Sequence, residues 1–144
     1  MQTVRDLLRK KGGEIYSVSP DSSVYEALQL MADKNIGAVL VLDGEQIVGI
    51  LSERDYARQV ILKGKTSRET PVREIMTTRV VFVKPEQTIE DCMALMTDKR
   101  IRHLPVIENG KLAGVLSIGD VVKAVISEKQ YLIEQLEAYI TSGG

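Results

Sequence analysis

Apolar residues recur at helical spacing in two stretches of the chain, Val24–Met31 and Ile89–Met96. Ser23 and Thr88 directly precede these stretches, and each is followed three positions later by an acidic residue. A serine or threonine with an acidic residue at that distance is typical of an N-terminal capping box. The pattern therefore predicts one amphipathic helix at each of the two places.

Each predicted helix is followed by two short apolar runs typical of β-strands. The first copy has "AVLVL" and "QIVGIL" joined by "DGE", and the second has "LPVI" and "KLAGVL" joined by "ENG". A second helix is expected to begin at Ser52 in one copy and at Ser117 in the other. With the short extended piece that ends at Pro20 or Pro85, each copy predicts the order β-α-β-β-α.

The two copies are a duplication. Sliding the sequence against itself by about 65 positions aligns Val18–Val60 with Val83–Val125 without a gap. The heptapeptides "GILSERD" and "GVLSIGD" then share a glycine, a serine and an aspartate at the same positions, and the earlier "TVRDLL" and "PVREIM" also resemble each other. The expected fold class is α+β, with two β-α-β-β-α repeats and a C-terminal helix.

These repeats set the expected domain boundaries. Residues 1–66 are expected to form repeat 1 with its N-terminal lead-in, residues 67–127 repeat 2, and residues 128–144 a C-terminal amphipathic helix and tail. The polar segment Lys63–Pro71, which contains glycine and proline, is predicted to link the repeats. One stripe of the last helix gathers Leu132, Ile133, Leu136, Tyr139 and Ile140. That helix is expected either to cap the fold or to contact a second chain.

Composition narrows the class of protein. The chain has 144 residues, 44% of them hydrophobic, and a net charge of -1, which suits a packed core and disfavours nucleic-acid binding. Its longest apolar run is far shorter than a bilayer span, and its N-terminus lacks a signal peptide's apolar stretch. We therefore expect a soluble cytoplasmic protein that does not bind a membrane. The single cysteine, Cys92, is expected to fill the core.

The repeated serine and aspartate have a simple structural explanation. A serine N-cap with an acidic residue at N3 satisfies free backbone N–H groups and stabilises a helix by about 1 kcal/mol. Three features favour a binding site instead. Both copies use aspartate where capping boxes prefer glutamate or glutamine, both place a glycine three residues before the serine, and both lie where a strand meets a helix N-terminus, which suits a phosphate.

The motifs identify a family resemblance. The doubled β-α-β-β-α unit, the "G-h-L-S-x-x-D" step from strand to helix (h, an apolar residue) and "RHLPV" in the second copy resemble a tandem pair of CBS (cystathionine β-synthase) domains, as in stand-alone bacterial CBS proteins. The resemblance implies that the repeats pack about a pseudo-two-fold axis and leave two related clefts. It also implies that the clefts bind AMP, ADP or ATP, and in some members NAD or S-adenosylmethionine, and that two pairs meet as a homodimer.

On this resemblance, each cleft requires residues for the ribose, the phosphate and the base. The candidate ribose-binding residues are Asp55, Asp120, Ser52 and Ser117. The candidate phosphate-binding residues are Arg54, Arg102 and His103. The candidate adenine-binding residues are Tyr16, Val18, Ile36, Ala38, Val81, Val83 and Ile101. Because the cations are unequally divided between the copies, the two sites are expected to differ in affinity.

The leading functional hypothesis is a regulatory module that binds an adenine nucleotide (AMP, ADP, ATP or NAD), senses energy or redox state, and signals in trans to a protein target by a conformational change. No catalytic cofactor, catalytic residue or metal site is expected. One alternative is a structural dimerisation module whose motif residues only cap helices. Another is a nucleotide-processing enzyme, for which the single histidine and the aspartates offer few catalytic groups.

Overall fold

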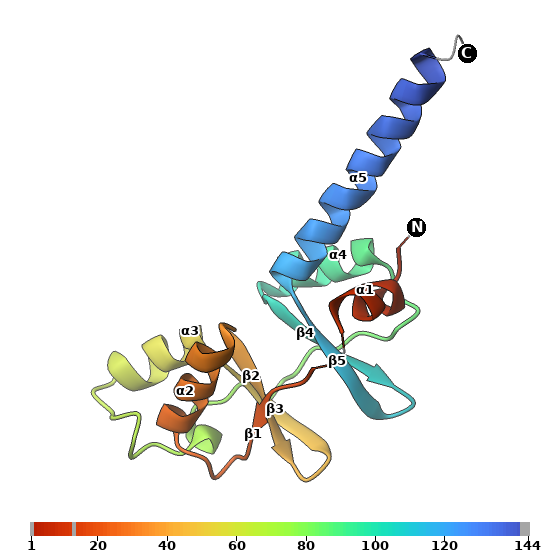
Figure 1. Cartoon of the computed structure of the whole chain (residues 1–144). Helices are drawn as coiled ribbons and strands as arrows, with labels where there is room; N and C mark the ends of the chain where they lie inside the picture. Colours follow the sequence, from red (N-terminus) through yellow and green to blue (C-terminus); the bar gives the residue numbers. More distant parts are fainter. Residues whose placement is uncertain (1, 13, 142–144) are drawn as a thin grey trace. The chain divides into compact units, whose positions relative to one another are not determined.

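The computed structural model describes residues 2–12 and 14–141 and has the α+β class that the pattern predicts (Figure 1). The chain forms two compact units. One comprises residues 14–81, and the other joins the two ends of the chain, up to residue 13 and from residue 82.

The unit of residues 14–81 contains a three-stranded sheet in the order β1-β2-β3, with β1 parallel and β3 antiparallel to β2. Its elements are β1 (Ser17–Val18), α2 (Val24–Lys34), β2 (Ala38–Asp43), β3 (Gln46–Ser52), α3 (Glu53–Tyr56), the π-helical turn η1 (Ala57–Ile61) and the 3-10 turn η2 (Val72–Glu74). The second predicted helix of repeat 1 is thus a short α-helix that continues as a wider π-helical turn.

The other unit has a two-stranded antiparallel sheet, β4-β5. Its elements are α1 (Val4–Lys11), α4 (Ile89–Lys99), β4 (His103–Glu108), β5 (Lys111–Ser117) and α5 (Ile118–Thr141). Where repeat 1 has the two-residue strand β1, repeat 2 has a single parallel bridge between Val83 and Val106. The first predicted strand of repeat 2 is reduced to that bridge.

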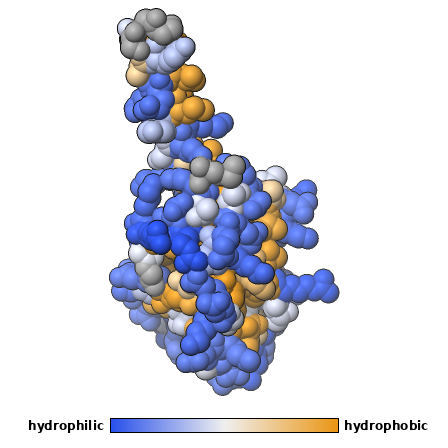
Figure 2. Space-filling model, turned by 90° about the vertical axis from the view of Figure 1, so that its right-hand side faces the viewer, coloured by the Kyte–Doolittle hydropathy of each residue, from blue (hydrophilic) through white to orange (hydrophobic). Residues whose placement is uncertain are grey.

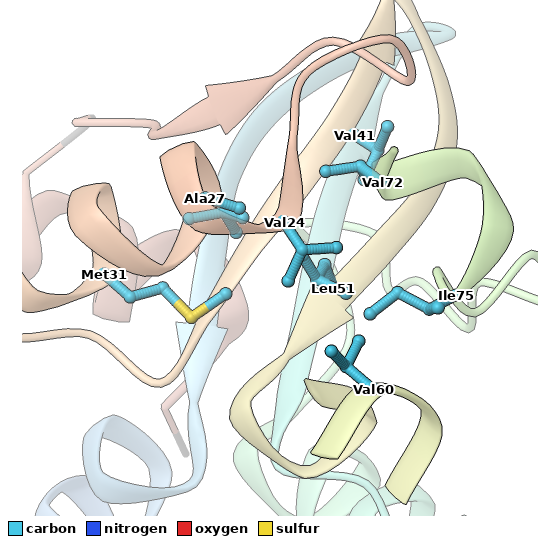
Figure 3. Packing of buried hydrophobic residues seen from close by; sticks show 9 residues of the cluster. Val24, Ala27, Met31, Val41, Leu51, Val60, Val72 and Ile75 are labelled. Carbon is cyan, nitrogen blue, oxygen red and sulfur yellow. The ribbon is translucent and has the colours of Figure 1, made fainter. Parts of the chain in front are cut away.

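Apolar side chains from every layer of the 14–81 unit form its core. Val24, Ala27 and Met31 on α2 point toward the sheet residues Val41 and Leu51, and the turns η1 and η2 close the far side (Figure 3). Val24, Ala27, Val41 and Leu51 are fully buried. The apolar face of α2, which the helical spacing predicts, thus packs against the apolar strand residues in one core.

Each segment that precedes a repeat in the sequence packs with the other repeat, inside one compact unit. In the first lead-in, Val4 N donates to Gln87 O (2.8 Å) and Arg5 N donates to Pro85 O (3.0 Å). In the second lead-in, Val72 N donates to Ser22 O (2.8 Å) and Arg73 N donates to Pro20 O (3.0 Å). The N-terminal lead-in therefore packs with repeat 2, and the lead-in between the repeats packs with repeat 1.

The compact units consequently divide the chain differently from the segments 1–66 and 67–127 that follow the sequence repeat. The predicted linker Lys63–Pro71 also lies inside the 14–81 unit, because Val24 N donates to Thr70 O and Tyr25 N donates to Ser67 O. Thr70 itself is buried. Backbone hydrogen bonds, which composition does not reveal, tie this polar segment to the start of α2.

Repeat 2 ends in one continuous helix. The expected helix after Ser117 and the expected C-terminal helix from residue 128 are both part of α5, Ile118–Thr141. From Lys129 to Thr141 every residue of α5 is exposed. This part of α5 extends beyond α1 and α4 of the same unit (Figure 1), so it does not cap the fold.

Candidate functional site

The two Ser-x-x-Asp motifs cap helices. Ser52 N donates to Asp55 Oδ2 (2.9 Å), and Asp55 N donates back to Ser52 Oγ (3.2 Å). Ser117 N donates to Asp120 Oδ2 (2.8 Å), and Asp120 N donates to Ser117 Oγ (3.1 Å). Both capping pairs use Oδ2, so Oδ1 of each carboxylate lies outside the cap.

The same cap occurs at two helices away from the motifs. Thr3 with Asp6 caps α1, and Thr88 with Asp91 caps α4, in each case with aspartate at N3. Aspartate at N3 therefore also occurs at two helices outside the motifs, whereas α2 has Glu26 at N3. Aspartate in the motifs therefore does not by itself favour a binding site, because a cap alone accounts for it.

The first N–H group after the serine of each motif also has a partner. Glu53 N donates to Gly37 O (3.1 Å), and Ile118 N donates to Arg102 O (2.8 Å). The N–H groups of Asp55 and Asp120 donate to the serine hydroxyls. Fewer backbone N–H groups therefore remain to bind a phosphate at these helix N-termini than the sequence alone implied.

A residue from the packed lead-in contacts each motif aspartate. Lys11 Nζ donates to Asp120 Oδ2 (2.6 Å) and to Val115 O (2.6 Å). Burial alone raises the pKa of Asp120, but the hydrogen bond and charge of Lys11 and the cap from Ser117 outweigh it, so the pKa lies below its ordinary value. Asp120 is thus held ionised as an acceptor.

The equivalent contact in the other unit is neutral. Thr77 Oγ1 donates to Asp55 Oδ1 at 3.4 Å, and Thr77 is paired with Ile50 on β3 through two backbone hydrogen bonds. One motif aspartate therefore faces an ammonium group, and the other faces a hydroxyl. The two candidate sites differ in charge, although their caps are the same.

The repeated glycines allow the lead-ins to approach. A Cβ at Gly49 would lie 2.7 Å from Met76 Sδ and 2.9 Å from Thr77 O, and a Cβ at Gly114 would lie 2.6 Å from Leu8 Cδ2. The prediction that each glycine marks a close approach is confirmed. The glycines place Thr77 and Lys11 within reach of the aspartates.

The three candidate phosphate-binding residues lie near the motifs with different exposure. Arg54 and Arg102 are exposed, and His103 is half-buried at the start of β4, where it pairs with Ser117 on β5. Burial, followed by the charge of Lys11, lowers the pKa of His103. The lowered pKa favours the neutral form of His103, and the charge of Lys11 lies close to it.

The candidate adenine-binding residues divide into core and partly exposed positions. Val83 is 1% exposed and Ala38 is 9% exposed. Val18 and Ile36 are partly buried against the apolar core, and Val81 and Ile101 are also partly buried. The Tyr16 hydroxyl donates to Glu14, and Lys34 Nζ lies 5.4 Å from the centre of the Tyr16 ring. The roles of these residues toward a base remain predictions.

A pocket of about 610 Å³ opens between α2 and α3 in the 14–81 unit. Its lining includes Ile36 from the candidate set, together with Met31, Asn35, Glu53 and Tyr56. Apolar walls with one carboxylate and one amide suit a small organic ligand. The sequence motifs did not indicate Asn35 or Tyr56.

Sequence reasoning also missed Lys11 and Thr77 as neighbours of the motif aspartates. Both follow lead-ins whose resemblance to each other was visible, and that resemblance was the available signal. Within residues 2–12 and 14–141, no three His, Cys, Asp or Glu side chains are grouped so that they could hold a metal. In the same residues, no helix has the length and apolar character needed to cross a membrane.

Comparison with known proteins supplies the family. The family model for the CBS domain matches residues 3–61 and 72–127. The chain is 41% identical to the mitochondrial CBS domain-containing protein CBSX3 of Arabidopsis thaliana, over 98% of this chain and 73% of the relative.

Solved structures agree with the sequence comparison. A candidate signal-transduction protein with CBS domains from Burkholderia ambifaria is 52% identical, with a TM-score of 0.85 over 88% of this chain and 95% of that one. A hexameric CBS-CP12 protein from bloom-forming cyanobacteria is 27% identical, with a TM-score of 0.75 over 85% of this chain and 70% of that one.

Proposed function

This chain belongs to the CBS domain family and carries two copies of the domain, and from that premise we propose that it is a regulatory module that binds an adenine nucleotide. Proteins of this family are in general regulatory and ligand-binding. The proposed ligands are AMP, ADP, ATP or NAD, which report energy or redox state. The nucleotide favours one conformation of the chain and so signals in trans to a protein target.

One observation carries the proposal. Asp55 and Asp120 lie at equivalent steps from strand to helix, and each uses Oδ2 for its cap and keeps Oδ1 outside it. Both carboxylates are part-buried. A carboxylate with one oxygen outside the cap is a suitable acceptor for a ribose hydroxyl. The capping serine keeps that oxygen in a fixed position.

The lead-in contacts support a difference between the two sites. At Asp120 a ligand meets Lys11, which adds a positive charge beside His103 and Arg102 and favours a phosphate-rich nucleotide. At Asp55 the corresponding neighbour is the Thr77 hydroxyl. We propose unequal affinities, and titration calorimetry that shows two equal and independent sites would contradict this.

The caps also favour a second candidate function, a structural dimerisation module without a ligand. Because Asp6 and Asp91 cap α1 and α4 in the same way, capping is a sufficient reason for an aspartate at each motif. An enzymatic role is the least supported. His103 is half-buried with a lowered pKa, and Cys92 is fully buried with a raised one, so neither is a ready nucleophile.

A thermal-shift experiment distinguishes these functions. Nucleotide-stripped protein is heated with AMP, ADP, ATP, NAD, NADH or S-adenosylmethionine at equal concentration. A ligand whose concentration is about one hundred times its Kd raises the free energy of unfolding by about 2.7 kcal/mol. Wild-type protein is expected to shift with at least one nucleotide. Absence of any shift contradicts the proposal and favours the structural module.

A matched control separates binding from capping. Asp55→Ala and Asp120→Ala remove a cap and a proposed ribose acceptor, whereas Asp91→Ala removes only a cap. All three are expected to lower the unfolding temperature by losing a cap worth about 1 kcal/mol, and Asp120→Ala also loses its ion pair with Lys11. Only the first two are expected to lose nucleotide-induced stabilisation. If all three keep it in full, the aspartates are capping residues alone.

The proposal includes a cytoplasmic location, where adenine nucleotides are abundant, and assembly as a homodimer through the CBS pairs. It includes no nucleic acid, membrane or catalytic cofactor. The conformational change is proposed to alter the binding of another polypeptide. A pull-down with this chain as bait, with and without the nucleotide, identifies a protein target whose binding to the chain changes.

A further inference from the structure

Helix α5 carries a long apolar surface, most of which the rest of the described chain leaves exposed. We define the apolar stripe of α5 by its members: Val122, Val125, Ile126, Leu132, Ile133, Leu136, Tyr139 and Ile140. Leu132 is 58% exposed, Leu136 54% and Ile140 71%. Orange apolar side chains gather along one side of this helix in Figure 2.

The spacing of the stripe is that of a helix that packs on another helix. Val122, Val125, Leu132, Leu136 and Tyr139 occupy a and d positions of a continuous heptad pattern, with Lys129 at one a position. Ile126, Ile133 and Ile140 occupy the adjoining e positions. A face that combines a, d and e is wider than a two-stranded seam and is typical of helix bundles.

The exposed area is close to what a specific interface needs. Seven stripe residues are 38 to 71% exposed, and with about 150–250 Å² for each large side chain they present on the order of 600 Å². A standard interface buries roughly 800 Å² on each partner. Monomeric proteins rarely leave an apolar patch of this size uncovered.

The charges beside the stripe favour a second copy of α5 as the partner and an antiparallel orientation of the two helices. Lys123, Gln130 and Glu137 form a row next to the three e-position isoleucines. Lys123 lies two turns before Gln130, and Glu137 lies two turns after it. When two copies of α5 pair antiparallel about Gln130, Lys123 of each lies beside Glu137 of the other. A parallel pair would instead place like charges together.

The same centre also aligns the apolar residues. An antiparallel pair about Gln130 brings the beginning of the stripe, at Val122, against its end, at Tyr139 and Ile140. Val122 and Ile126 are exposed on the first half of α5, so that half can receive the outer half of a second helix. We propose that α5 is a self-association surface that pairs antiparallel with α5 of a second copy of this chain.

A lipid surface fits the helix less well. Helices that lie on membranes usually carry lysine and arginine on their polar face. Beyond Lys129 the only charged residues of α5 are Glu134 and Glu137, and its last turn has no basic residue. An anionic bilayer would repel this half of α5, whereas Lys123 of a second copy attracts it.

Sedimentation velocity of the full chain over a range of concentrations tests the surface. Leu136→Glu places a charge in the stripe and is expected to weaken the association step that uses α5 at least tenfold, whether or not a dimer also forms through the CBS pairs. Tyr131→Glu is the matched control, because Tyr131 is 64% exposed but lies outside the stripe; it is expected to leave the dissociation constant within twofold. Equal effects of the two variants, with helical circular dichroism unchanged, overturn the proposal.

A charge exchange tests the antiparallel direction. Lys123→Glu and Glu137→Lys are each expected to weaken self-association several-fold, and the double variant is expected to restore it. Lys129→Leu is expected to strengthen it, because a lysine at an a position lowers the stability of a helix pair. Failure of the double variant to restore association overturns the antiparallel arrangement. Binding to vesicles of anionic phospholipid that Leu136→Glu abolishes, without a change in self-association, overturns the second copy as partner.

Discussion

Replacing the two repeated glycines by alanine is expected to have unequal effects, although the sequence makes them equivalent. At Gly49 the new Cβ would lie 2.9 Å from the backbone oxygen of Thr77 and 2.7 Å from Met76 Sδ. At Gly114 it would meet only the flexible end of the Leu8 side chain, at 2.6 Å. A side-chain tip can rotate away, whereas a paired backbone cannot.

The magnitudes follow from these contacts. Thr77 and Ile50 exchange two backbone hydrogen bonds, of 3.0 and 2.9 Å, and moving Thr77 weakens both. Overpacking costs about 1–3 kcal/mol, a lost hydrogen bond costs about 1 kcal/mol, and removing glycine from a strand returns about 0.5–1 kcal/mol. Gly49→Ala is therefore expected to lower the free energy of unfolding by about 3 kcal/mol, and Gly114→Ala by about 1 kcal/mol or less.

Urea denaturation followed by circular dichroism measures both values. As a control, the side chain that obstructs each new Cβ, Leu8 or Met76, is shortened to alanine. In a Leu8→Ala background, Gly114→Ala is expected to be neutral or stabilising, whereas Met76→Ala does not rescue Gly49→Ala because the Thr77 oxygen remains. Equal destabilisation by the two alanines, or full rescue by Met76→Ala, would refute the assignment of the Thr77 backbone as the obstacle.

Three further predictions concern charged and reactive groups of the other unit. Lys11→Ala is expected to raise the pKa of Asp120 toward its ordinary value, as read by NMR titration, and to reduce the free energy of unfolding at neutral pH by about 1 kcal/mol or less, because the ion pair is about one-third exposed. Since the folded pKa of Asp120 is lowered, this contribution is lost as pH falls through that pKa. His103 also has a lowered pKa, so the unfolded chain takes up its proton first, and stability is expected to fall as pH drops below about 6.5; a His103→Gln variant that keeps the same slope in urea titrations at pH 7 and 5 would contradict this. Burial raises the pKa of Cys92 to about 11, so a thiol reagent such as Ellman's reagent is expected to modify it only after unfolding in urea, and rapid reaction of folded protein would contradict that.

Periodicity predicted most of the fold because each element has its own local signal. The helices α2 and α4, the two hairpins and the capping residues Ser23 and Thr88 all occur where the pattern placed them. The exchange of lead-ins was not predictable from local pattern, because Val4 and Val72 carry the same apolar signal whichever repeat they pack against. Only long-range backbone hydrogen bonds distinguish the two arrangements.

The sequence predicted where the motif residues lie in the fold, but it predicted only some of the side chains that contact them. The motif aspartates lie at equivalent steps from strand to helix, as expected, and the glycines mark close approaches. The neighbours Lys11 and Thr77 were missed, because their contacts arise from the packing of the lead-ins. The preference for aspartate was over-interpreted, since Asp6 and Asp91 occupy the same capping position at α1 and α4, outside the motifs.

The exchanged lead-ins also affect the order in which the chain folds during translation. Residues 14–81 are contiguous, so this unit has all of its parts as soon as they leave the ribosome. Helix α1 emerges first, yet its buried residues Val4 and Leu7 have their packing partners more than seventy residues downstream. The earliest helix to be synthesised is thus among the last to dock, and its apolar face stays open to solvent or to a chaperone in the interval.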